Sequence, residues 1–554
     1  MINEMFCMQC EEAQKGDACL KTGTCGKRTP LSARIDLLMF MIKGLSVVAD
    51  TLAQHNKKVD IRTSHLITES LYASMTNVNF DDLDIERRII ACMELRYEMI
   101  QMAHIEQVPM PTIDVVQWFG LPIDFADKAQ QVSIEEEQDL EQRAYREWVI
   151  YGLKGMAAYL YHAINLKRDD LSIHRFICHT LSRITQEKLS ETAWNSLILK
   201  VGEYGLRTLA LLDNAHIGNL GNPTLQEVTT RPRQRPGILV SGHDMSDLLD
   251  LLEQCEKAGV DVYTHCEMLP AHYYPRLRHY HCLAGHYGGS WWQQHRDFEA
   301  FGGPILMTSN CLVPLYQNES YQHKLFTTGA VGYPSARHIV ADTSGHKDFS
   351  LMIDVALRSN PPEALRYSTI SGGYAHQTLS HHLETMSDYF HRGMIKHFAI
   401  IAGCDGRMNY RNYYTELVHN FPPETIFLTA GCTKYRFIGE DLGYIGTIPR
   451  ILDAGQCNDT YSLILFTNML RDALKLNHLR EVPISFHLAW YEQKSIILMF
   501  TLLYLGIPFR LGPTFPAFLS PSMRLLLREK FSIHGITTPN GDVFTILRDS
   551  SSNT

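Results

Sequence analysis

The chain has 554 residues, of which 45% are hydrophobic and 20% are charged, and its formal net charge is −9. This length predicts about three or four globular domains, and the acidic balance, without a basic stripe, argues against a nucleic-acid partner. The opening residues lack the features of a secretory signal, and the longest apolar segment, IILMFTLLYLGIPF, is too short to span a bilayer. We therefore expect a cytoplasmic protein with no membrane partner and with reduced thiols.

Four cysteines near the start of the chain have the spacing C-x2-C-x8-C-x5-C: Cys7, Cys10, Cys19 and Cys25. In a reducing compartment, clustered cysteines indicate a metal or redox site rather than disulfides. A zinc ribbon usually has two tight cysteine pairs, whereas only one is present here, so the spacing favours an iron–sulfur cubane over structural zinc. A thioredoxin-like role for CMQC is weaker still, because no strand precedes it.

Residues 30 to about 225 repeat apolar residues at helical spacing, which predicts a bundle of several long helices. Ser133, with Glu136 three residues later, is a predicted N-cap for the helix that runs through EQRAYREWVIYGLKGMAAYLYHAI. The Met and Leu stripes of this half are interpreted as core.

The composition changes at 229–237, where TTRPRQRPG reads as a linker. After it, short apolar runs alternate with helical stretches, a pattern typical of α/β domains with mainly parallel sheets. A second boundary is expected within 360–374. We therefore predict an N-terminal cysteine motif with helical bundles over 1–228 and two α/β domains over 229–365 and 366–554.

Metal-binding residue types follow seven of these apolar runs. Ligands in open α/β sheets bind beyond the carboxyl ends of the strands, and the side chains found there are His243, Glu267, Cys311, Cys404, Cys432, Cys457 and Glu492. Four thiols, an imidazole and two carboxylates are more ligands than one tetrahedral zinc accepts. Soft thiolates in this number favour a multi-iron cluster with mixed sulfur, nitrogen and oxygen ligands.

Other candidate residues are given ordinary roles. The stretch 272–295 is rich in histidine and aromatic residues but lacks a helix-spaced ligand motif with an acidic partner. We therefore expect its histidines to line the wall of the site or to pack: His272, His279, His281, His286 and His295. Five further cysteines are interpreted as ordinary thiols, although one of them borders Glu267; they are Cys92, Cys178, Cys255, Cys266 and Cys282.

Eight segments in order carry a resemblance over essentially the whole chain: FCMQCEE, SGHD, VDVYTHCEMLPAHYYP, TSNC, AGCDGR, LTAGCTKYRF, LDAGQCND and AWYEQK. Together they resemble the hybrid cluster proteins, also called prismane proteins or hydroxylamine reductases. The resemblance implies a [4Fe-4S] cluster on the four N-terminal cysteines, whose spacing is of the family's short type. It also implies a hybrid [4Fe-2O-2S] cluster on the seven strand-end residues, with a persulfide on Cys404.

The resemblance further implies a fold and a reaction. The fold is N-terminal helical bundles followed by two Rossmann-like α/β domains, similar to carbon monoxide dehydrogenases; no GxGxxG motif indicates NAD binding. The reaction is reduction of hydroxylamine to ammonia and water, or of nitric oxide to nitrous oxide, in nitrosative stress defence. The expected electron donor is a ferredoxin or an NADH-dependent reductase.

Four residues are predicted to take part in catalysis. Glu267 and Glu492 would serve as both ligands and proton relays, and His243 as a ligand able to open a site. Lys494 would supply a proton or hold a negatively polarised intermediate. Alternative functions are transfer of a nitrosyl group to protein thiols, a plain electron carrier, and a carbon monoxide dehydrogenase. The last would be expected to need nickel, and the carboxylates argue against it.

Overall fold

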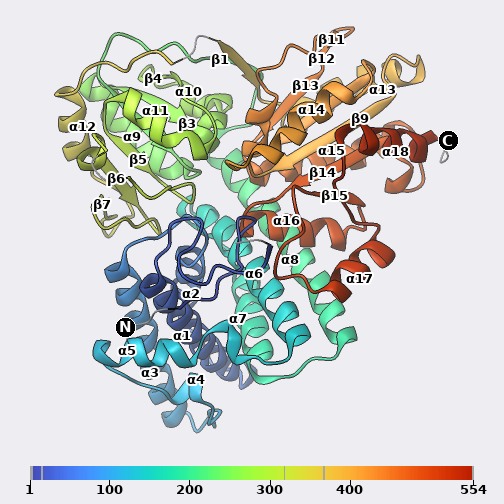
Figure 1. Cartoon of the computed structure of the whole chain (residues 1–554). Helices are drawn as coiled ribbons and strands as arrows, with labels where there is room; N and C mark the ends of the chain where they lie inside the picture. The colour runs from blue at the N-terminus through green and yellow to red at the C-terminus, as the bar shows by residue number, and fades with distance from the viewer. Residues whose placement is uncertain (1–3, 14–15, 317–318, 366–367, 552–554) are drawn as a thin grey trace.

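The computed structural model describes residues 4–13, 16–316, 319–365 and 368–551. A helical layer carries two α/β regions that lie side by side above it (Figure 1). The N-terminus lies in the helical layer and the C-terminus at the outer side of the second α/β region. This architecture confirms the predicted fold class of helices followed by α/β units with parallel sheets.

The elements of the helical layer are α1 (Thr29–Gln54), α2 (Ile61–Ala73), α3 (Asp82–Ile105), α4 (Asp114–Gln117), α5 (Phe125–Gln131), α6 (Leu140–Asn165), α7 (Leu171–Gln186) and α8 (Glu191–Leu220). The N-termini of α2, α3, α6, α7 and α8 are capped by Asp or Ser side chains, whereas α1 begins at Thr29–Pro30 without a side-chain cap. The predicted cap at Ser133 is wrong for the long helix. Ser133 caps only a short 3-10 turn, Ile134–Glu136, whereas Asp139 accepts hydrogen bonds from the backbone N–H groups of Glu141 and Gln142 and starts α6.

The first sheet has six parallel strands in the order β4-β3-β2-β5-β6-β7. Helices α9 (Met245–Ala258) and α12 (Ser350–Leu357) pack with it into one apolar cluster, and α10 (Pro275–Arg278) and α11 (Gln294–Phe301) connect its strands. The strands are β2 (Gly237–Ser241), β3 (Asp261–His265), β4 (Leu283–His286), β5 (Ile305–Met307), β6 (Leu325–Thr328) and β7 (Arg337–Ile339).

The second sheet also has six parallel strands, in the order β13-β10-β9-β14-β15-β16. Its strands are β9 (His397–Gly403), β10 (Thr425–Ala430), β13 (Ile451–Gly455), β14 (Ile484–Ala489), β15 (Phe509–Gly512) and β16 (His534–Gly535). A small hairpin pairs β11 (Tyr444–Ile445) with β12 (Ile448–Pro449). The helices of this region are α13 (His376–His391), α14 (Tyr413–Asn420), α15 (Thr460–Ala473), α16 (Gln493–Tyr504), α17 (Pro521–Phe531) and α18 (Pro539–Ser551).

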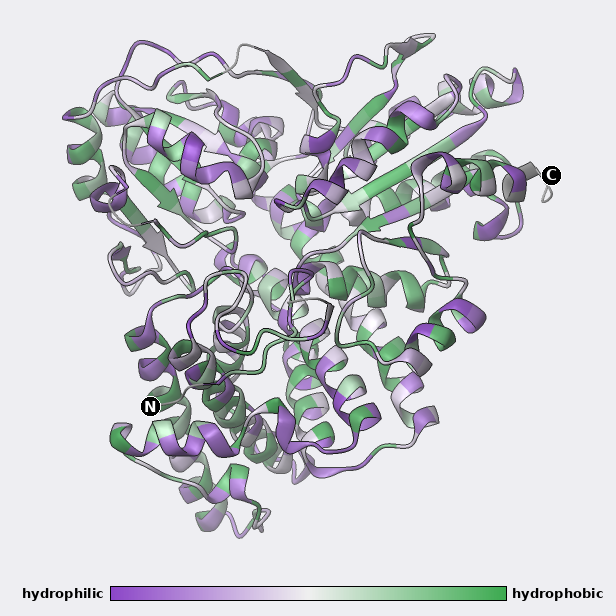
Figure 2. Ribbon diagram, in the orientation of Figure 1, coloured by the Kyte–Doolittle hydropathy of each residue, from purple (hydrophilic) through white to green (hydrophobic). Residues whose placement is uncertain are grey.

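The inner strands of both sheets are buried on both faces, as expected for parallel sheets covered by helices, and they are predominantly hydrophobic (Figure 2). An antiparallel pair, β1 (Gln226–Thr229) with β8 (Thr369–Gly372), brings together the two ends of the segment that forms the first sheet. The predicted boundary at 228 falls within β1 and the one at 365 falls before β8; the division into three domains stays a prediction.

Helix α16 belongs to the C-terminal part of the chain but completes the helical layer, where it packs against α6 and α8. The approach is close enough to require glycine. A Cβ atom on Gly155 would lie 2.1 Å from Gln493 O, and one on Gly202 would lie 2.1 Å from Phe500 O. The apolar run noted in the sequence is therefore a buried core helix. Within the described residues, no helix combines the length and apolarity needed to cross a membrane.

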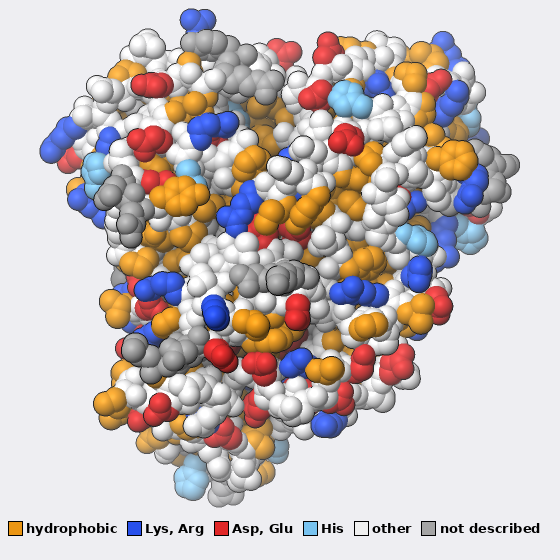
Figure 3. All heavy atoms as spheres, viewed as in Figure 1, with side chains coloured by type: hydrophobic (Ala, Val, Ile, Leu, Met, Phe, Trp, Pro, Cys, Tyr) orange, Lys and Arg blue, Asp and Glu red, His pale blue; other side chains and the backbone are white. Residues whose placement is uncertain are grey.

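On the face drawn in Figure 3, basic and acidic side chains are interspersed rather than separated by sign.

Candidate functional site

The seven strand-end side chains line one buried cavity between the two sheets. His243, Glu267 and Cys311 follow β2, β3 and β5 of the first sheet. The other four follow β9, β10, β13 and β14 of the second sheet: Cys404, Cys432, Cys457 and Glu492. The two sheets therefore present the carboxyl ends of these seven strands to the same space, as open α/β sheets do for ligands.

His243, Glu267 and Cys457 form the tightest group in this cavity, and their ligand atoms all lie within 4.8 Å of one another. His243 Nε2 lies 3.5 Å from Cys457 Sγ and 3.6 Å from Glu267 Oε2. The other ring nitrogen, Nδ1, lies 2.7 Å from Ser309 Oγ, which fixes the orientation of the ring. An imidazole, a carboxylate and a thiol thus face one point.

Burial raises the pKa of Glu267 to about 7, against the opposing effect of Lys434. Its Oε2 accepts the backbone N–H of Cys457 at 2.9 Å, whereas Oε1 is buried without a hydrogen-bond partner in the described part of the chain. A buried, unpaired carboxylate oxygen is costly unless a cation or a proton satisfies it. This atom is therefore suited to bind a metal or to hold a proton.

A second group joins two residues of the cavity wall, Cys404 and Glu492, to Lys494 behind that wall. Cys404 Sγ lies 3.9 Å from Glu492 Oε1 and 2.9 Å from Ser495 Oγ. Asn310 joins this group by donating from Nδ2 to Glu492 Oε1 at 3.2 Å and by accepting from Lys494 Nζ at 2.7 Å. Burial raises the pKa of Glu492, with the Lys494 charge opposing it. A cation, an amide and a carboxylate therefore form one hydrogen-bonded row beside Cys404.

The backbone before Cys404 adopts a conformation that only glycine takes easily. Gly403 has φ +112°, and a Cβ atom there would lie 2.2 Å from Ala489 O. Cys404 N then donates to the same Ala489 O at 2.7 Å, so β9 and β14 deliver Cys404 and Glu492 as a pair.

Burial raises the pKa of the Cys404 and Cys457 thiols well above the ordinary value. The thiolate is the form that binds metals, so these thiols need a nearby positive charge to ionise. A metal cluster would supply that charge.

Cys266 lies behind two cysteines of this site, a contact that the sequence interpretation missed. It was interpreted as an ordinary thiol, but its buried side chain interacts with the thiols of Cys311 and Cys432. Its backbone φ is +50° and that of Cys311 is +127°, both unusual for a residue with a side chain. Its position next to Glu267 was the only sequence signal that pointed to this place.

The N-terminal cysteines fold into a compact loop. Cys7 and Cys19 exchange two backbone hydrogen bonds of 3.1 and 2.8 Å. Burial, and after it the neighbouring Cys25 and Cys7 thiols, raises the pKa of Cys10 well above its ordinary value. Lys27 is buried beside these thiols, with Nζ donating to Met75 O at 2.7 Å. The four thiols thus share one place with a cation next to them.

The cysteine loop is hydrogen-bonded directly to residues at the buried cavity between the two sheets, which we call the deep cavity. Glu11 N donates to the carbonyl oxygen of Tyr491 at 2.9 Å, and Tyr491 lines that cavity. The fully buried Arg411 donates to Glu11 Oε2 at 3.2 Å and to the Cys404 carbonyl at 3.1 Å. One residue therefore contacts both the loop after Cys10 and the backbone of a strand-end cysteine.

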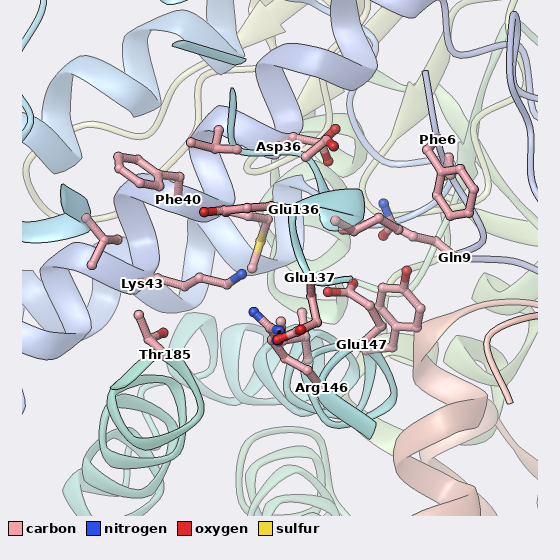
Figure 4. Close-up of a pocket in the computed structure, with 18 of the residues that line it drawn as sticks. Phe6, Gln9, Asp36, Phe40, Lys43, Glu136, Glu137, Arg146, Glu147 and Thr185 are labelled. Atoms are coloured by element: carbon pink, nitrogen blue, oxygen red, sulfur yellow. Dashed lines mark hydrogen bonds and ion pairs between the residues drawn. The ribbon is translucent and has the colours of Figure 1, made fainter. Parts of the chain in front are cut away.

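A second, larger cavity of about 420 Å³ borders the cysteine loop and is lined in part by Cys7 and Gln9. Lys43 and Arg146 extend into it, with Asp36 and Glu147 around them (Figure 4). Burial raises the pKa of Asp36 to about 7. It is a charged chamber rather than an apolar pocket.

Three of the five histidines that were not expected to bind metal, His272, His286 and His295, lie outside the lining of the buried cavity and have other partners. His272 Nε2 and His286 Nδ1 each lie 3.0 Å from Thr264 Oγ1, and His286 Nε2 lies 3.1 Å from Tyr435 OH. His295 pairs with Glu319. Packing and hydrogen bonding account for these three side chains.

The chain matches the Prismane/CO dehydrogenase family over residues 5–544, and it belongs to that family. Similar curated proteins are named hydroxylamine reductase. One from Bacteroides fragilis strain YCH46 is 42% identical over 98% of this chain and 99% of its own length. Those from Acetivibrio thermocellus and Methanocaldococcus jannaschii are each 43% identical over 97% of this chain and 99% of their own.

Solved structures with the same fold are carbon monoxide dehydrogenases. The enzyme from Thermococcus sp. AM4 aligns with a TM-score of 0.58 and 14% identity over 99% of this chain and 91% of its own. Carbon monoxide dehydrogenase IV from Carboxydothermus hydrogenoformans aligns with a TM-score of 0.57 and 15% identity over 96% and 89%. At this identity the likeness concerns the fold alone. The family and its curated relatives confirm the prediction of an enzyme of the oxidoreductase class.

Proposed function

We propose that this protein is an iron–sulfur reductase of hydroxylamine, with an electron-relay cluster at the N-terminal cysteines and a reaction centre in the deep cavity. The observation that carries the proposal is the convergence of seven metal-binding side chains from two sheets on one buried cavity. The names of the curated relatives supply the substrate.

The deep cavity fits a multi-iron cluster in its donor chemistry. Four thiols, one imidazole and two carboxylates surround it, and Glu267 Oε1 is buried without a partner among the described residues. Mixed sulfur, nitrogen and oxygen donors suit iron better than they suit zinc alone. The residues that would hold a hybrid [4Fe-2O-2S] cluster are His243, Glu267, Cys311, Cys404, Cys432, Cys457 and Glu492, with a persulfide proposed on Cys404.

The N-terminal loop fits a [4Fe-4S] cluster better than a single zinc ion. Sulfur atoms around a tetrahedral zinc are about 3.8 Å apart, given a zinc–sulfur distance of about 2.3 Å. Within the described residues, no three of the Cys7, Cys10, Cys19 and Cys25 sulfur atoms lie within 4.8 Å of one another. A wider ring of four thiols is what a four-iron cubane needs.

The reaction consumes two electrons and two protons: NH2OH + 2 e⁻ + 2 H⁺ gives NH3 + H2O. The metal centre, when bound, supplies the electrons and the Lewis acid that weakens the N–O bond. Lys494 Nζ, held by Asn310 beside Glu492, is placed to donate a proton to a substrate in the cavity. Glu267 and Glu492 are placed to hold protons there, because burial raises the pKa of each.

Electrons would enter at the cysteine loop and pass through its attachment to Tyr491. Cys7 and Cys25 are only partly buried, which gives a redox partner such as a ferredoxin or an NADH-dependent reductase access to that cluster. Glu11 N donates to the carbonyl oxygen of Tyr491, and Tyr491 directly precedes the proposed ligand Glu492 in the chain. The charged cavity beside the loop adds groups that can take up protons when the cluster is reduced.

The test is anaerobic purification followed by iron and sulfide analysis, EPR and a hydroxylamine assay with reduced methyl viologen. We expect about eight irons per chain, two distinct paramagnetic signals and stoichiometric ammonia. About four irons with a single cubane signal would contradict the deep centre. Zinc at the N-terminal cysteines would contradict the relay.

The same preparation distinguishes the competing reactions. With nitric oxide in place of hydroxylamine, reductant-dependent nitrous oxide would add the nitrosative-stress role to the proposal. Nitrosation of a target thiol without consumption of reductant, and without ammonia from hydroxylamine, would replace the reductase by a nitrosyl transferase.

A further inference from the structure

A second group of metal-binding side chains lies in the helical layer, away from the cavity described above. It consists of His65 on α2, His174 on α7 and Asp169 in the turn before α7, and the ligand atoms of all three lie within 4.8 Å of one another. His65 Nε2 lies 2.9 Å from Asp169 Oδ2, and His174 Nε2 lies 2.8 Å from Asp169 Oδ1.

We propose that His65, Asp169 and His174 form a binding site for a divalent cation of the zinc class, with one open position toward solvent. In a tetrahedral zinc site with ligand distances of about 2.0–2.2 Å, neighbouring ligand atoms are about 3.4 Å apart. The observed distances of 2.8 and 2.9 Å need to open by only about half an ångström.

The orientation of His174 supports this assignment. The side chain is 1% exposed, and its Nδ1 atom lies 3.2 Å from Thr68 Oγ1. When Nδ1–H donates to that hydroxyl, Nε2 keeps its lone pair and directs it at the carboxylate. Metal-binding histidines are commonly oriented in this way by a partner on the other ring nitrogen. A cation between Nε2 and Asp169 satisfies both groups.

The solvent access of this group and its number of ligands also suit a zinc-class cation. The side chains of His65 and Asp169 are 41% and 31% exposed, so an ion can enter from solvent and a water molecule can complete its coordination. Two imidazoles and one carboxylate are a set found in zinc sites that keep a fourth position open. A bound ion would fix α2 to the start of α7, and α2 leads through Tyr72 to Asn77 at the wall of the deep cavity.

The experiment measures zinc binding to the full-length, iron-loaded protein by competition with a colorimetric zinc indicator. It compares the wild type with His65→Ala, Asp169→Asn and His179→Ala. His179 is the matched control. It lies on α7, as His174 does, and it is an exposed histidine that pairs with a single carboxylate, Asp50, at 3.2 Å. Both test variants change partly exposed side chains, so folding is expected to be preserved.

We expect the wild type and His179→Ala to bind one more zinc equivalent than the two test variants, or to bind it at least tenfold more tightly. Anomalous diffraction at the zinc edge should place that ion between His65 and His174. Equal binding by the wild type, His65→Ala and Asp169→Asn, or an equal loss in His179→Ala, would overturn the site. Neither readout depends on the reductase activity.

Discussion

His243 and Cys457 meet across the gap between the two sheets, with Nε2 3.5 Å from Sγ although 214 positions separate them in the chain. The Gln456 side chain links the two α/β regions at this contact by hydrogen bonds. Its Nε2 donates to the carbonyl oxygens of His243 at 3.1 Å and of Glu267 at 2.8 Å. The deep site therefore forms only when both α/β regions are folded and docked.

Replacing Cys457 with serine should empty the deep centre and leave the N-terminal cluster in place. We expect the iron content to fall by about half, because one of two clusters is lost, and hydroxylamine reduction to disappear. Iron analysis and EPR on the anaerobic protein measure both effects. Cys255→Ser, in a buried thiol on α9, is the control and should behave as the wild type. Retention of both signals in Cys457→Ser would contradict its role as a ligand.

Lys494→Gln tests the proposed proton donor. The side chain is fully buried, and its Nζ donates to Asn310 Oδ1. Loss of a general acid should lower kcat for hydroxylamine by about 100-fold, without changing the iron content. Steady-state kinetics with reduced methyl viologen give this value, and the exposed Lys396→Gln serves as the control. A rate within twofold of the wild type would remove Lys494 from the mechanism.

Cys266→Ala should change the deep centre without removing its iron. A neutral thiol beside the Cys311 and Cys432 sulfurs can donate S–H hydrogen bonds to them once they are ionised, and such bonds favour the more negative, reduced cluster. We expect a lower midpoint potential in an EPR-monitored titration and partial rescue by Cys266→Ser, whose hydroxyl also donates. The control is the buried thiol variant Cys282→Ala. An unchanged potential in Cys266→Ala would make Cys266 a packing residue only.

Asp36 predicts a specific pH dependence of stability. Burial raises its pKa from 3.8 to about 7 in the folded protein, so between these values the folded state holds a proton that the unfolded chain has lost. Stability should therefore fall as the pH rises from about 4 to 7. Asp36→Asn should remove this part of the slope and add about 1–2 kcal/mol at pH 8, after allowance for solvent in the cavity.

Thermal unfolding at pH 5 and pH 8 measures this difference. The Asn variant should gain in midpoint only at the higher pH. Asp127→Asn, at an exposed position of α5, should shift neither midpoint. A gain for Asp36→Asn that is the same at both pH values would contradict the raised pKa.

The sequence predicted the arrangement of the deep site because parallel strands place their carboxyl ends at one edge of a sheet. A Cys or Glu that follows a buried apolar run, as after β9 and β14, can be recognised from the neighbouring sequence alone. The Cys266 contact was not predictable, because it depends on a left-handed backbone conformation, φ +50°, that a residue with a side chain rarely adopts.

Contacts between distant elements were also beyond the sequence. His65 and Asp169 are 104 positions apart and share no local spacing, so only the packing of α2 beside α7 reveals them. The start of α6 was misplaced because Ser133 and Asp139 are both good caps and both are used, Ser133 by the short turn Ile134–Glu136 and Asp139 by α6.

The position of α16 has a consequence for the order in which this protein matures. The helix packs against α6 and α8, yet it begins only at Gln493, whereas α6 ends at Asn165 and α8 at Leu220, so the ribosome makes it long after both. Until Gln493–Tyr504 has emerged, the glycine-lined groove of the helical layer has no occupant, and Tyr491 is not available to hold the cysteine loop. Metal loading at both of the proposed centres would therefore follow synthesis of almost the entire chain. A truncated product would expose an apolar groove to proteolysis before it could hold iron.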